Sequence, residues 1–271
     1  MTILRSRDNP RVRRWARLAS ERAERRRERR AVAEGPHLVG AALSHGWPLE
    51  ALVVSESGLA RPEIAALVAA AGLEPTVLAD RVFRSTFEVA TPQGIAAELA
   101  TDARANADAN RQQAGPWVFL EHVQDPGNVG TIVRSAAAFG AAAVVLDAGC
   151  ADPWSPKALR SGMGGHFGVP IVQCAAPRWP SLEAALREFQ RDHGGTVLAA
   201  ESRGATPLYE AALEGRIGWV FGSEGRGLSE TVRALAAASV AIPVAGKTES
   251  LNVAAAAAIC LYETSRRLAR T

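Results

Sequence analysis

The chain has 271 residues, of which 48% are hydrophobic, and its 31 basic and 28 acidic side chains give a formal net charge of +3. This length suggests two domains, and the hydrophobic content excludes wholesale disorder. The longest apolar stretches, Ala136–Leu146 and Val253–Tyr262, are shorter than the roughly 20 residues that cross a bilayer, so we expect no membrane-spanning helix.

The first 36 residues are strongly basic, with twelve arginines, no lysine and five acidic residues, a local net charge of +7. Apolar residues recur at helical spacing after Asn9-Pro10, which predicts a helix with Trp15 as a packing anchor. Arginine concentrated at one end of a chain is typical of a protein that binds a phosphate backbone. A solvated helix is the alternative, because acidic residues lie three or four positions from several arginines, and both interpretations can hold together.

Short alternating elements follow the basic segment and predict a small α/β domain over residues 1–100. The expected strands are Ala31–Glu34, Leu49–Ser55, Pro75–Leu78 and Gly94–Leu99. The expected helices are Pro36–Ser44, Ile64–Ala71 and Asp80–Phe87.

Residues 101–116 change character and read as a linker, because Thr101–Pro116 is polar and ends in Gly-Pro. The alternation of strands and helices is stronger in residues 117–271, which we expect to form a second domain. Its strands are nearly continuous apolar runs, which indicates a parallel sheet covered on both faces. The expected strands are Trp117–Val123, Ala142–Asp147, Val169–Gln173, Thr196–Ala200, Trp219–Gly222 and Val240–Val244. The expected helices are Asn128–Phe139, Pro156–Gly162, Leu182–Arg191 and Asn252–Ala269.

Cysteine usage and the first residues predict a cytoplasmic protein. The three cysteines show no CxxC or Cys/His ligand spacing, so we expect reduced core thiols and no metal site; they are Cys150, Cys174 and Cys260. Arginines follow Met1–Leu4 directly, without the apolar stretch of a signal peptide.

Three loops at the ends of expected strands carry unusual polar residues and glycines: Glu121–Gly130, Phe221–Gly227 and Ile242–Asn252. Ligands of open α/β sheets bind at the carboxyl ends of the strands, where these loops lie. Neither a dinucleotide-binding GxGxxG nor a hydrolase GxSxG occurs. Gly246-Lys247-Thr248 is similar to the end of a P-loop, but Ala241 stands where its first glycine should be.

The three loops form an ordered set: Asn128-x-Gly-x-x-x-Arg134, Phe221-Gly-x-Glu-Gly-x-Gly227, and Ile242-Pro-x-x-Gly followed by Ser250-Leu-Asn-Val-Ala254. This set resembles the three motifs of the SpoU/TrmH family, the S-adenosylmethionine-dependent RNA ribose 2′-O-methyltransferases of the SPOUT superfamily. The resemblance covers Trp117–Arg270. The front half is similar to the L30e-like substrate-binding domain of rRNA-modifying members, through the segments Ser6–Pro10, Glu34–Val39 and Thr91–Gly94.

The resemblance implies an α/β fold in which a C-terminal SPOUT domain with a parallel sheet carries a deep C-terminal trefoil knot, preceded by the small L30e-like domain. It also implies a homodimer, an RNA partner, and S-adenosyl-L-methionine as the cofactor. The knot is an expectation from the resemblance alone, because knotted chains are rare and the local sequence pattern does not predict one.

Site residues follow from the matched positions. The resemblance assigns cofactor contacts to Gly222, Ile242 and Leu251, and catalytic roles to Asn128, Arg134, Glu224, Ser250 and Asn252. Purely structural interpretations stay open for several of them: Ile242 can end a core strand, Gly222 can make a turn, and Asn252 can cap the last helix. Ala254 departs from the family pattern, which commonly has serine there.

In related enzymes the arginine that matches Arg134 is credited with activating the 2′-hydroxyl. A guanidinium is nevertheless a poor base, because it stays protonated. We hypothesise that it stabilises the developing alkoxide and an adjacent phosphate. The proton could leave through the substrate phosphate or through a perturbed arginine. A further hypothesis places Arg160, Ser161 and His166 in contact with RNA.

The favoured function is 2′-O-methylation of a ribose in structured RNA, most readily 23S rRNA because of the front domain. The alternatives are a tRNA 2′-O-methyltransferase, an RNA-binding assembly factor that keeps the fold without catalysis, and a nucleotide-binding protein that uses Gly246–Thr248.

Overall fold

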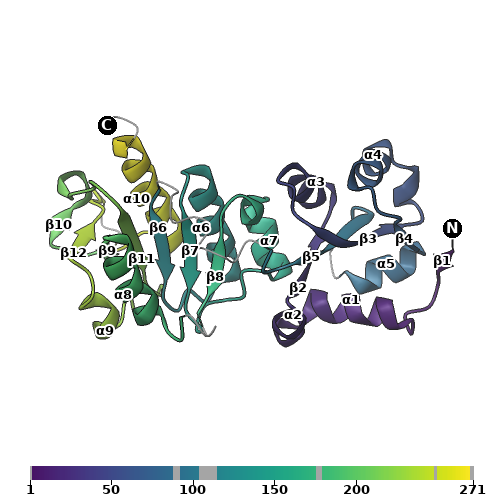
Figure 1. The fold of residues 1–271 in the computed structure, drawn as a ribbon, viewed down its shortest axis with the longest axis horizontal. Helices are drawn as coiled ribbons and strands as arrows, with labels where there is room; N and C mark the ends of the chain where they lie inside the picture. Colours follow the sequence, from purple (N-terminus) through teal and green to yellow (C-terminus); the bar gives the residue numbers. More distant parts are fainter. Residues whose placement is uncertain (1, 88–91, 104–114, 175–178, 247–248, 269–271) are drawn as a thin grey trace. The chain divides into compact units, whose positions relative to one another are not determined.

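The structure, a computed structural model, describes residues 2–87, 92–103, 115–174, 179–246 and 249–268. It divides into two compact units (Figure 1). The first comprises the described residues of Met1–Arg104 and of Asp152–Phe167, and the second comprises those of Ala105–Ala151 and of Gly168–Thr271. Most of the expected linker Thr101–Pro116 lies outside the described residues. The domain limits 1–100 and 117–271 stay a prediction.

Five strands form a mixed sheet in the first unit: β1 (Ile3–Leu4), β2 (Arg30–Glu34), β3 (Leu49–Ser55), β4 (Thr76–Leu78) and β5 (Ile95–Ala100). Their order is β1-β4-β3-β5-β2. β5 runs antiparallel to both of its neighbours, whereas the other pairs are parallel. The helices are α1 (Pro10–Ser20), α2 (Arg22–Glu28), α3 (Pro36–Ser44), α4 (Pro62–Ala71) and α5 (Asp80–Thr86).

The start of α1 follows its local sequence. Pro10 occupies the first turn, where its missing N–H costs nothing, and the Asn9 side chain accepts a hydrogen bond from the amide of Arg11. The Trp15 ring is 2% exposed, which confirms it as a packing anchor, and its indole donates to Glu98 at 2.8 Å. The helix ends at Ser20, because Glu21 adopts an extended conformation and separates α1 from α2.

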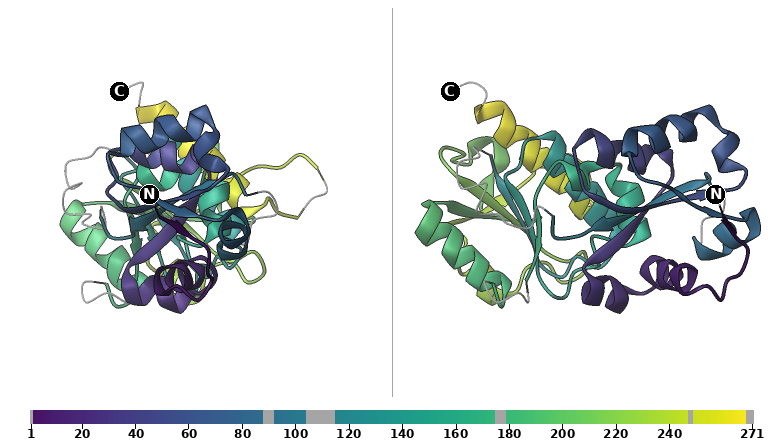
Figure 2. Two further views of the ribbon diagram at one scale, coloured as in Figure 1. Left: turned by 90° about the vertical axis from the view of Figure 1, so that its right-hand side faces the viewer. Right: turned by 45° about the vertical axis from the view of Figure 1, so that its right-hand side comes forward.

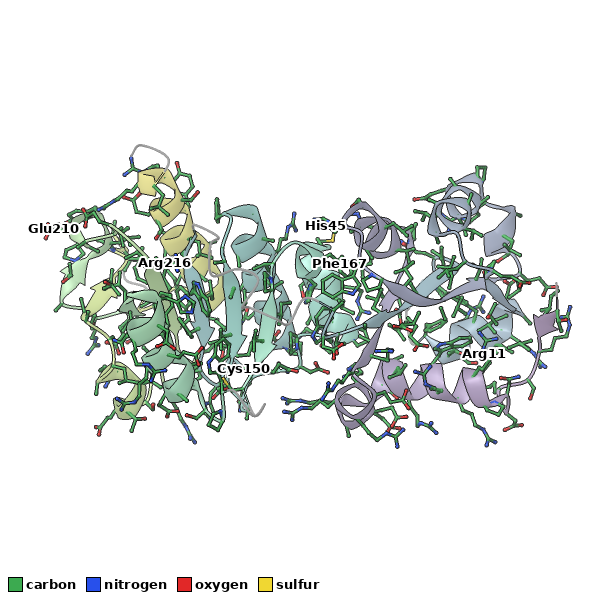
Figure 3. All side chains as sticks on the ribbon, viewed as in Figure 1. Arg11, His45, Cys150, Phe167, Glu210 and Arg216 are labelled. Carbon is green, nitrogen blue, oxygen red and sulfur yellow. The ribbon has the colours of Figure 1, made fainter. Side chains whose placement is uncertain are left out.

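The segment Asp152–Phe167 leaves the second sheet and packs within the first unit. It contains α7 (Pro156–Gly162) and a short 3₁₀ turn, Gly165–Phe167. The ring of Phe167, labelled in Figure 3, lies 5.4 Å from that of Trp47, and Trp154 lies 5.7 Å from the same indole. The apolar pattern of this segment does not predict in which of the two units it packs.

The second unit is built on seven strands: β6 (Trp117–Leu120), β7 (Ala143–Leu146), β8 (Ile171–Gln173), β9 (Thr196–Ala200), β10 (Thr206–Pro207), β11 (Ile217–Phe221) and β12 (Ala238–Ala241). Their order is β10-β12-β9-β11-β6-β7-β8, and all of these pairs are parallel. The expected parallel α/β architecture is confirmed. Sheet order does not decide whether the chain is knotted, so the trefoil knot stays a prediction.

Helices cover both faces of this sheet (Figure 2). They are α6 (Pro126–Ala138), α8 (Leu182–His193), α9 (Glu230–Arg233) and α10 (Val253–Leu268). On one face, Phe189 of α8 packs against Trp117 and Phe119. On the other face, α10 lies beside α6, and its Thr264 hydroxyl accepts a hydrogen bond from the Trp219 indole at 2.9 Å. Because all pairs in this sheet are parallel, the carboxyl ends of β6, β11 and β12 lie at the same edge of the sheet.

Candidate active site

A cavity of about 590 Å³ opens at the carboxyl ends of β11 and β12. Its walls come from the loop after β11, the loop after β12 and the start of α10. Of the residues assigned from the sequence, those that line it are Gly222, Glu224, Ile242, Ser250, Leu251 and Asn252. Two of the three motif loops therefore converge on this cavity.

Hydrogen bonds join all three motif loops beside the cavity. The Asn128 amide nitrogen donates to Glu224 Oε1 at 2.5 Å, and the Asn252 amide nitrogen donates to Asn128 Oδ1 at 3.1 Å. Asn128 lies outside the cavity lining, but it bridges two residues that form it. Side chains 96 and 124 positions from Asn128 in the sequence thus form one polar chain.

Helix caps hold this polar chain in place. Asp125 caps α6 by accepting from the amides of Gly127 and Asn128, which fixes the backbone that carries Asn128. Asn252 Oδ1 accepts from the amides of Ala254 and Ala255 at the start of α10. Asn252 therefore caps its helix with its oxygen and contacts Asn128 with its nitrogen, so the structural and the site interpretations hold together.

The turn after β11 requires glycine at its first position. A Cβ on Gly222 would lie 2.3 Å from the carbonyl carbon of Gly227 and 2.5 Å from the amide nitrogen of Leu228. Ser223 and Gly227 exchange backbone hydrogen bonds that close the turn, and Gly227 has a φ of +67°. Glu224 stands in this closed turn, which positions its carboxylate beside Asn128.

These residues fit a nucleoside-type cofactor such as S-adenosylmethionine. The cavity volume of about 590 Å³ lies within the range of small-molecule sites. The Leu251 side chain is exposed and, with Ile242, offers an apolar wall. Gly222 lines the cavity, and its missing side chain lets the backbone of Gly227 and Leu228 close over the strand end, which fixes the shape of this wall.

Arg134 is not brought to the cavity. It lies on α6, exposed, and has no hydrogen bond or ion pair with any residue that the structure describes. Six positions along an α-helix correspond to a rise of about 9 Å and a rotation of about 240° beyond one full turn. Arg134 and Asn128 therefore point to different sides of α6, and no described contact connects them.

Two contacts at the same sheet edge were not expected from the sequence. The buried carboxylate of Glu121 accepts from the backbone amide and the hydroxyl of Ser229, at 2.8 and 2.6 Å. The His122 ring pairs with Asp147 across an Nδ1–Oδ2 distance of 2.5 Å. An acidic residue at a strand end and a histidine beside it were the only sequence signals for these contacts.

The arginines of the first 36 residues are extensively compensated by acidic side chains. At least eight of them form ion pairs within the described residues, namely Arg5, Arg13, Arg14, Arg17, Arg25, Arg27, Arg29 and Arg30. Glu98 raises the pKa of Arg14 further above its ordinary value through a bidentate hydrogen bond. Arg7 and Arg26 are exposed and have no such partner among the described residues. Much of this segment thus serves the fold.

The hypothesis that His166 contacts RNA is wrong for this structure. Its ring is fully buried, contacts Trp154, and has Nε2 2.8 Å from the carbonyl oxygen of Pro153. Burial lowers the pKa of His166 to about 4, so the ring is neutral at pH 7. Arg160 is about half exposed and Ser161 is only partly buried, so their contact with RNA stays a prediction.

Free, buried cysteines occupy the core. Burial raises the pKa of Cys174 and of Cys260 to about 12, and burial together with Asp147 raises that of Cys150 still further. In the described part of the chain, no group of three or more acidic, histidine or cysteine side chains could hold a metal ion. No helix in those same ranges is long and apolar enough to cross a membrane.

Comparison with known proteins divides the chain into two matched regions. Residues 116–262 match the SpoU rRNA Methylase family, and residues 9–97 match the MRM3-like substrate binding domain. The chain is 32% identical over 263 residues to the 23S rRNA (guanosine(2553)-2′-O)-methyltransferase RlmP of Bacillus subtilis, covering 97% of this chain and 98% of the relative. It is 28% identical to the 23S rRNA (uridine(2479)-2′-O)-methyltransferase of Streptomyces viridochromogenes, covering 96% and 90%.

Solved structures resemble the whole chain. The SpoU methyltransferase AviRb from Streptomyces viridochromogenes, in complex with AdoMet, has a TM-score of 0.83 at 26% identity and covers 96% of this chain and 98% of its own. The AdoMet-bound rRNA methyltransferase from Sinorhizobium meliloti has a TM-score of 0.82 at 29% identity, with 98% of both chains covered.

Proposed function

The chain belongs to the SpoU rRNA methylase family, and we propose that it transfers a methyl group from S-adenosylmethionine to a ribose 2′-hydroxyl of 23S rRNA. The observation that carries this assignment is the Glu224–Asn128–Asn252 hydrogen-bond chain beside a cavity of about 590 Å³. Relatives that match nearly the whole chain, front unit included, bear 23S rRNA in their names, which favours rRNA over tRNA.

The cavity at the ends of β11 and β12 binds the cofactor. Gly222 contributes a tightly closed turn that only glycine permits, while Ile242 and Leu251 contribute apolar surface. When bound, S-adenosylmethionine supplies an electrophilic methyl group, and the rest of the cofactor is the leaving group, a neutral thioether.

Asn128, Glu224 and Asn252 position the reacting ribose. Glu224 accepts from the Asn128 amide and so fixes which way that amide faces, while Asn252 occupies its oxygen. A fixed polar chain holds a hydroxyl in line with a methyl donor at low entropic cost. Ser250 adds a hydroxyl on the cavity wall.

Arg134 supplies positive charge to the RNA side of the reaction. Its guanidinium stays protonated and stabilises the developing alkoxide or a neighbouring phosphate. Because it lies on the exposed side of α6, away from the cavity lining, it acts when RNA or a second copy of the chain brings substrate to that helix.

A homodimer is supported by an apolar surface on α10, which packs against α6. Ile259 is 38% exposed and Tyr262 is 54% exposed, and the Tyr262 ring contacts Phe139 at the end of α6. A second copy covering this face would bury large side chains that otherwise stand in water. We place the protein in the cytoplasm, with its RNA substrate, and we retain the trefoil knot as part of the proposal.

The test is incubation with methyl-labelled S-adenosylmethionine and unmodified 23S rRNA, with unmodified tRNA in parallel, followed by mapping of alkali-resistant linkages. We expect label at one ribose of 23S rRNA. Label in a base would refute 2′-O chemistry, label in tRNA alone would favour the tRNA alternative, and RNA binding without label would favour an idle assembly factor. Binding of ATP in place of S-adenosylmethionine would favour a nucleotide-binding protein that uses Gly246–Thr248, of which Lys247 and Thr248 lie outside the described residues.

A further inference from the structure

His122 is held in a backbone conformation that L-residues avoid. Its φ is +54°, and among the described residues only Arg29 and Met163 share a positive φ without being glycine. Residues other than glycine are uncommon in the left-handed region, although histidine is found there more often than most, and such outliers cluster at functional sites. Glycine would adopt this turn without strain. The contacts of the imidazole at this position are therefore worth tracing.

Asp147 fixes the imidazole from two sides. Its Oδ1 accepts the backbone amide of His122 at 3.1 Å, and its Oδ2 lies 2.5 Å from Nδ1 of the ring. The ring also lies on Gly149, where a Cβ would approach its Cδ2 within 2.6 Å. Carboxylate, backbone and glycine together leave the ring one orientation.

The fixed ring remains open to the exterior. The His122 side chain is 60% exposed, whereas that of Asp147 is 10% exposed. Nε2 has no hydrogen-bond partner among the described residues. Because Nδ1 faces the carboxylate, the geometry favours the tautomer with its proton on Nδ1 and the lone pair of Nε2 directed outward.

His122 stands in the loop that carries Asn128. β6 lies between β11, whose end opens into the cavity, and β7, which leads into Asp147. Two strand spacings, roughly 10 Å, separate β11 from β7. His122 therefore stands at the same sheet edge as Asn128, within reach of an RNA strand that extends from a ribose reacting there toward β7.

We propose that His122, oriented by Asp147, is a substrate-contacting residue that accepts a hydrogen bond from a hydroxyl or amino group of the RNA next to the target nucleotide. This role rests on the proposed function. It deepens that function by adding a contact outside the three motifs. RNA offers such donors on every ribose, since the 2′-hydroxyl both donates and accepts.

The test compares His122→Gly, His122→Gln and His122→Phe with the wild type. We expect His122→Gly to raise KM and Kd for a 23S rRNA transcript about tenfold, with kcat within about twofold and S-adenosylmethionine affinity unchanged. Its melting temperature is set by two opposing effects, the relief of backbone strain and the loss of the ring that pairs with Asp147, so RNA affinity is measured at a temperature where each variant is folded. Glutamine, which offers an acceptor oxygen, should restore part of the affinity, and phenylalanine should restore none.

Two further variants separate contact from bracing. Gly149→Ala leaves His122 in place but displaces its ring, and should weaken RNA binding as His122→Gly does. Met163→Gly relieves the same backbone strain at an exposed site of the first unit and serves as the matched control, with RNA affinity unchanged.

Equal RNA affinity of wild type and His122→Gly would overturn the proposal and leave His122 as a brace between β6 and β7. Full affinity of His122→Phe would replace the hydrogen bond by ring stacking and overturn it as well. RNA binding is measured without methyl transfer. An inactive wild type that binds RNA would thus refute the proposed function alone, while a wild type that binds no RNA would refute both.

Discussion

Replacing Arg25 with methionine should lower the urea concentration at which the first unit unfolds, because the guanidinium of Arg25 is buried and holds this unit together. Arg25 and Asp152 are 5% and 6% exposed, and their Nε–Oδ2 distance is 2.6 Å. One terminal nitrogen of Arg25 also donates to the carbonyl oxygens of Leu18 and Ala19, at 2.7 and 3.2 Å. The guanidinium thus satisfies a carboxylate and the end of α1 at once.

Loss of the guanidinium leaves Asp152 charged and buried, with the amide of Trp154 as a remaining donor at 3.0 Å. Removing one partner of a buried ion pair lowers the free energy of unfolding by about 3–5 kcal/mol. Because the hydrogen bond from Trp154 survives, we expect a loss at the lower end of this range, about 3 kcal/mol. The double variant Arg25→Met/Asp152→Asn should recover more than about 1 kcal/mol of that loss, because asparagine carries no charge and still accepts from Trp154.

Urea unfolding followed by tryptophan fluorescence measures the effect, since Trp15, Trp47 and Trp154 all lie in this unit. Arg27→Met is the control: Arg27 is 66% exposed in its ion pairs with Glu24 and Glu28, so its loss should cost less than about 1 kcal/mol. A cost below about 1 kcal/mol for Arg25→Met, or a double variant as unstable as the single one, would refute the reasoning.

Three other outcomes are expected. Gly222→Ala should weaken S-adenosylmethionine binding at least a hundredfold by calorimetry, because the new Cβ would displace Gly227 and Leu228 from the closed turn that lines the cavity, whereas Gly225→Ala, where a Cβ meets nothing within 4 Å, should bind normally; equal affinities would contradict this packing argument. His166 has a pKa of about 4 when folded, against about 6.5 when unfolded. The unfolded state therefore binds more protons between these values, and stability should fall by roughly 3 kcal/mol as pH drops from 7 to 4; a His166→Gln variant with the same pH profile would disprove the assignment. Folded protein at pH 8 should resist iodoacetamide at all of its cysteines, because their pKa values are raised, and should react in urea; rapid labelling of the folded form would exclude buried thiols at Cys150, Cys174 and Cys260.

The repeating architecture was predictable because its causes are local. Continuous apolar runs such as Ala143–Leu146 specify strands buried on both faces, and Ser181 with Gly194 delimits α8 as helix signals should. Two short strands, β1 and β10, were not expected, because two residues carry no periodicity. The break at Glu21 has no signal in the local sequence, since glutamate favours continuing a helix.

The convergence of the motif loops followed from a general rule, whereas the orientation of individual side chains did not. Parallel strands deliver their carboxyl ends to one edge, so the contact between Asn128 and Glu224 could be anticipated. The six-residue spacing of Asn128 and Arg134 already separates their directions on α6, but the sequence alone did not show which side of the helix faces the cavity. The role of Arg25 depends on Asp152, 127 positions later. Neither a phosphate-binding segment nor a solvated helix, the two interpretations of the arginine-rich sequence, predicts this buried and distant partner.

The excursion of Asp152–Phe167 has a consequence for how the protein is made and dissected. The N-terminal unit cannot satisfy Arg25 or cover Trp47 until a segment encoded far downstream has left the ribosome. During synthesis its completion must therefore wait while two strands of the other sheet, β6 and β7, are already emerging. A truncated protein that ends before residue 152 should fold poorly, because it lacks a segment that packs in the core of the first unit.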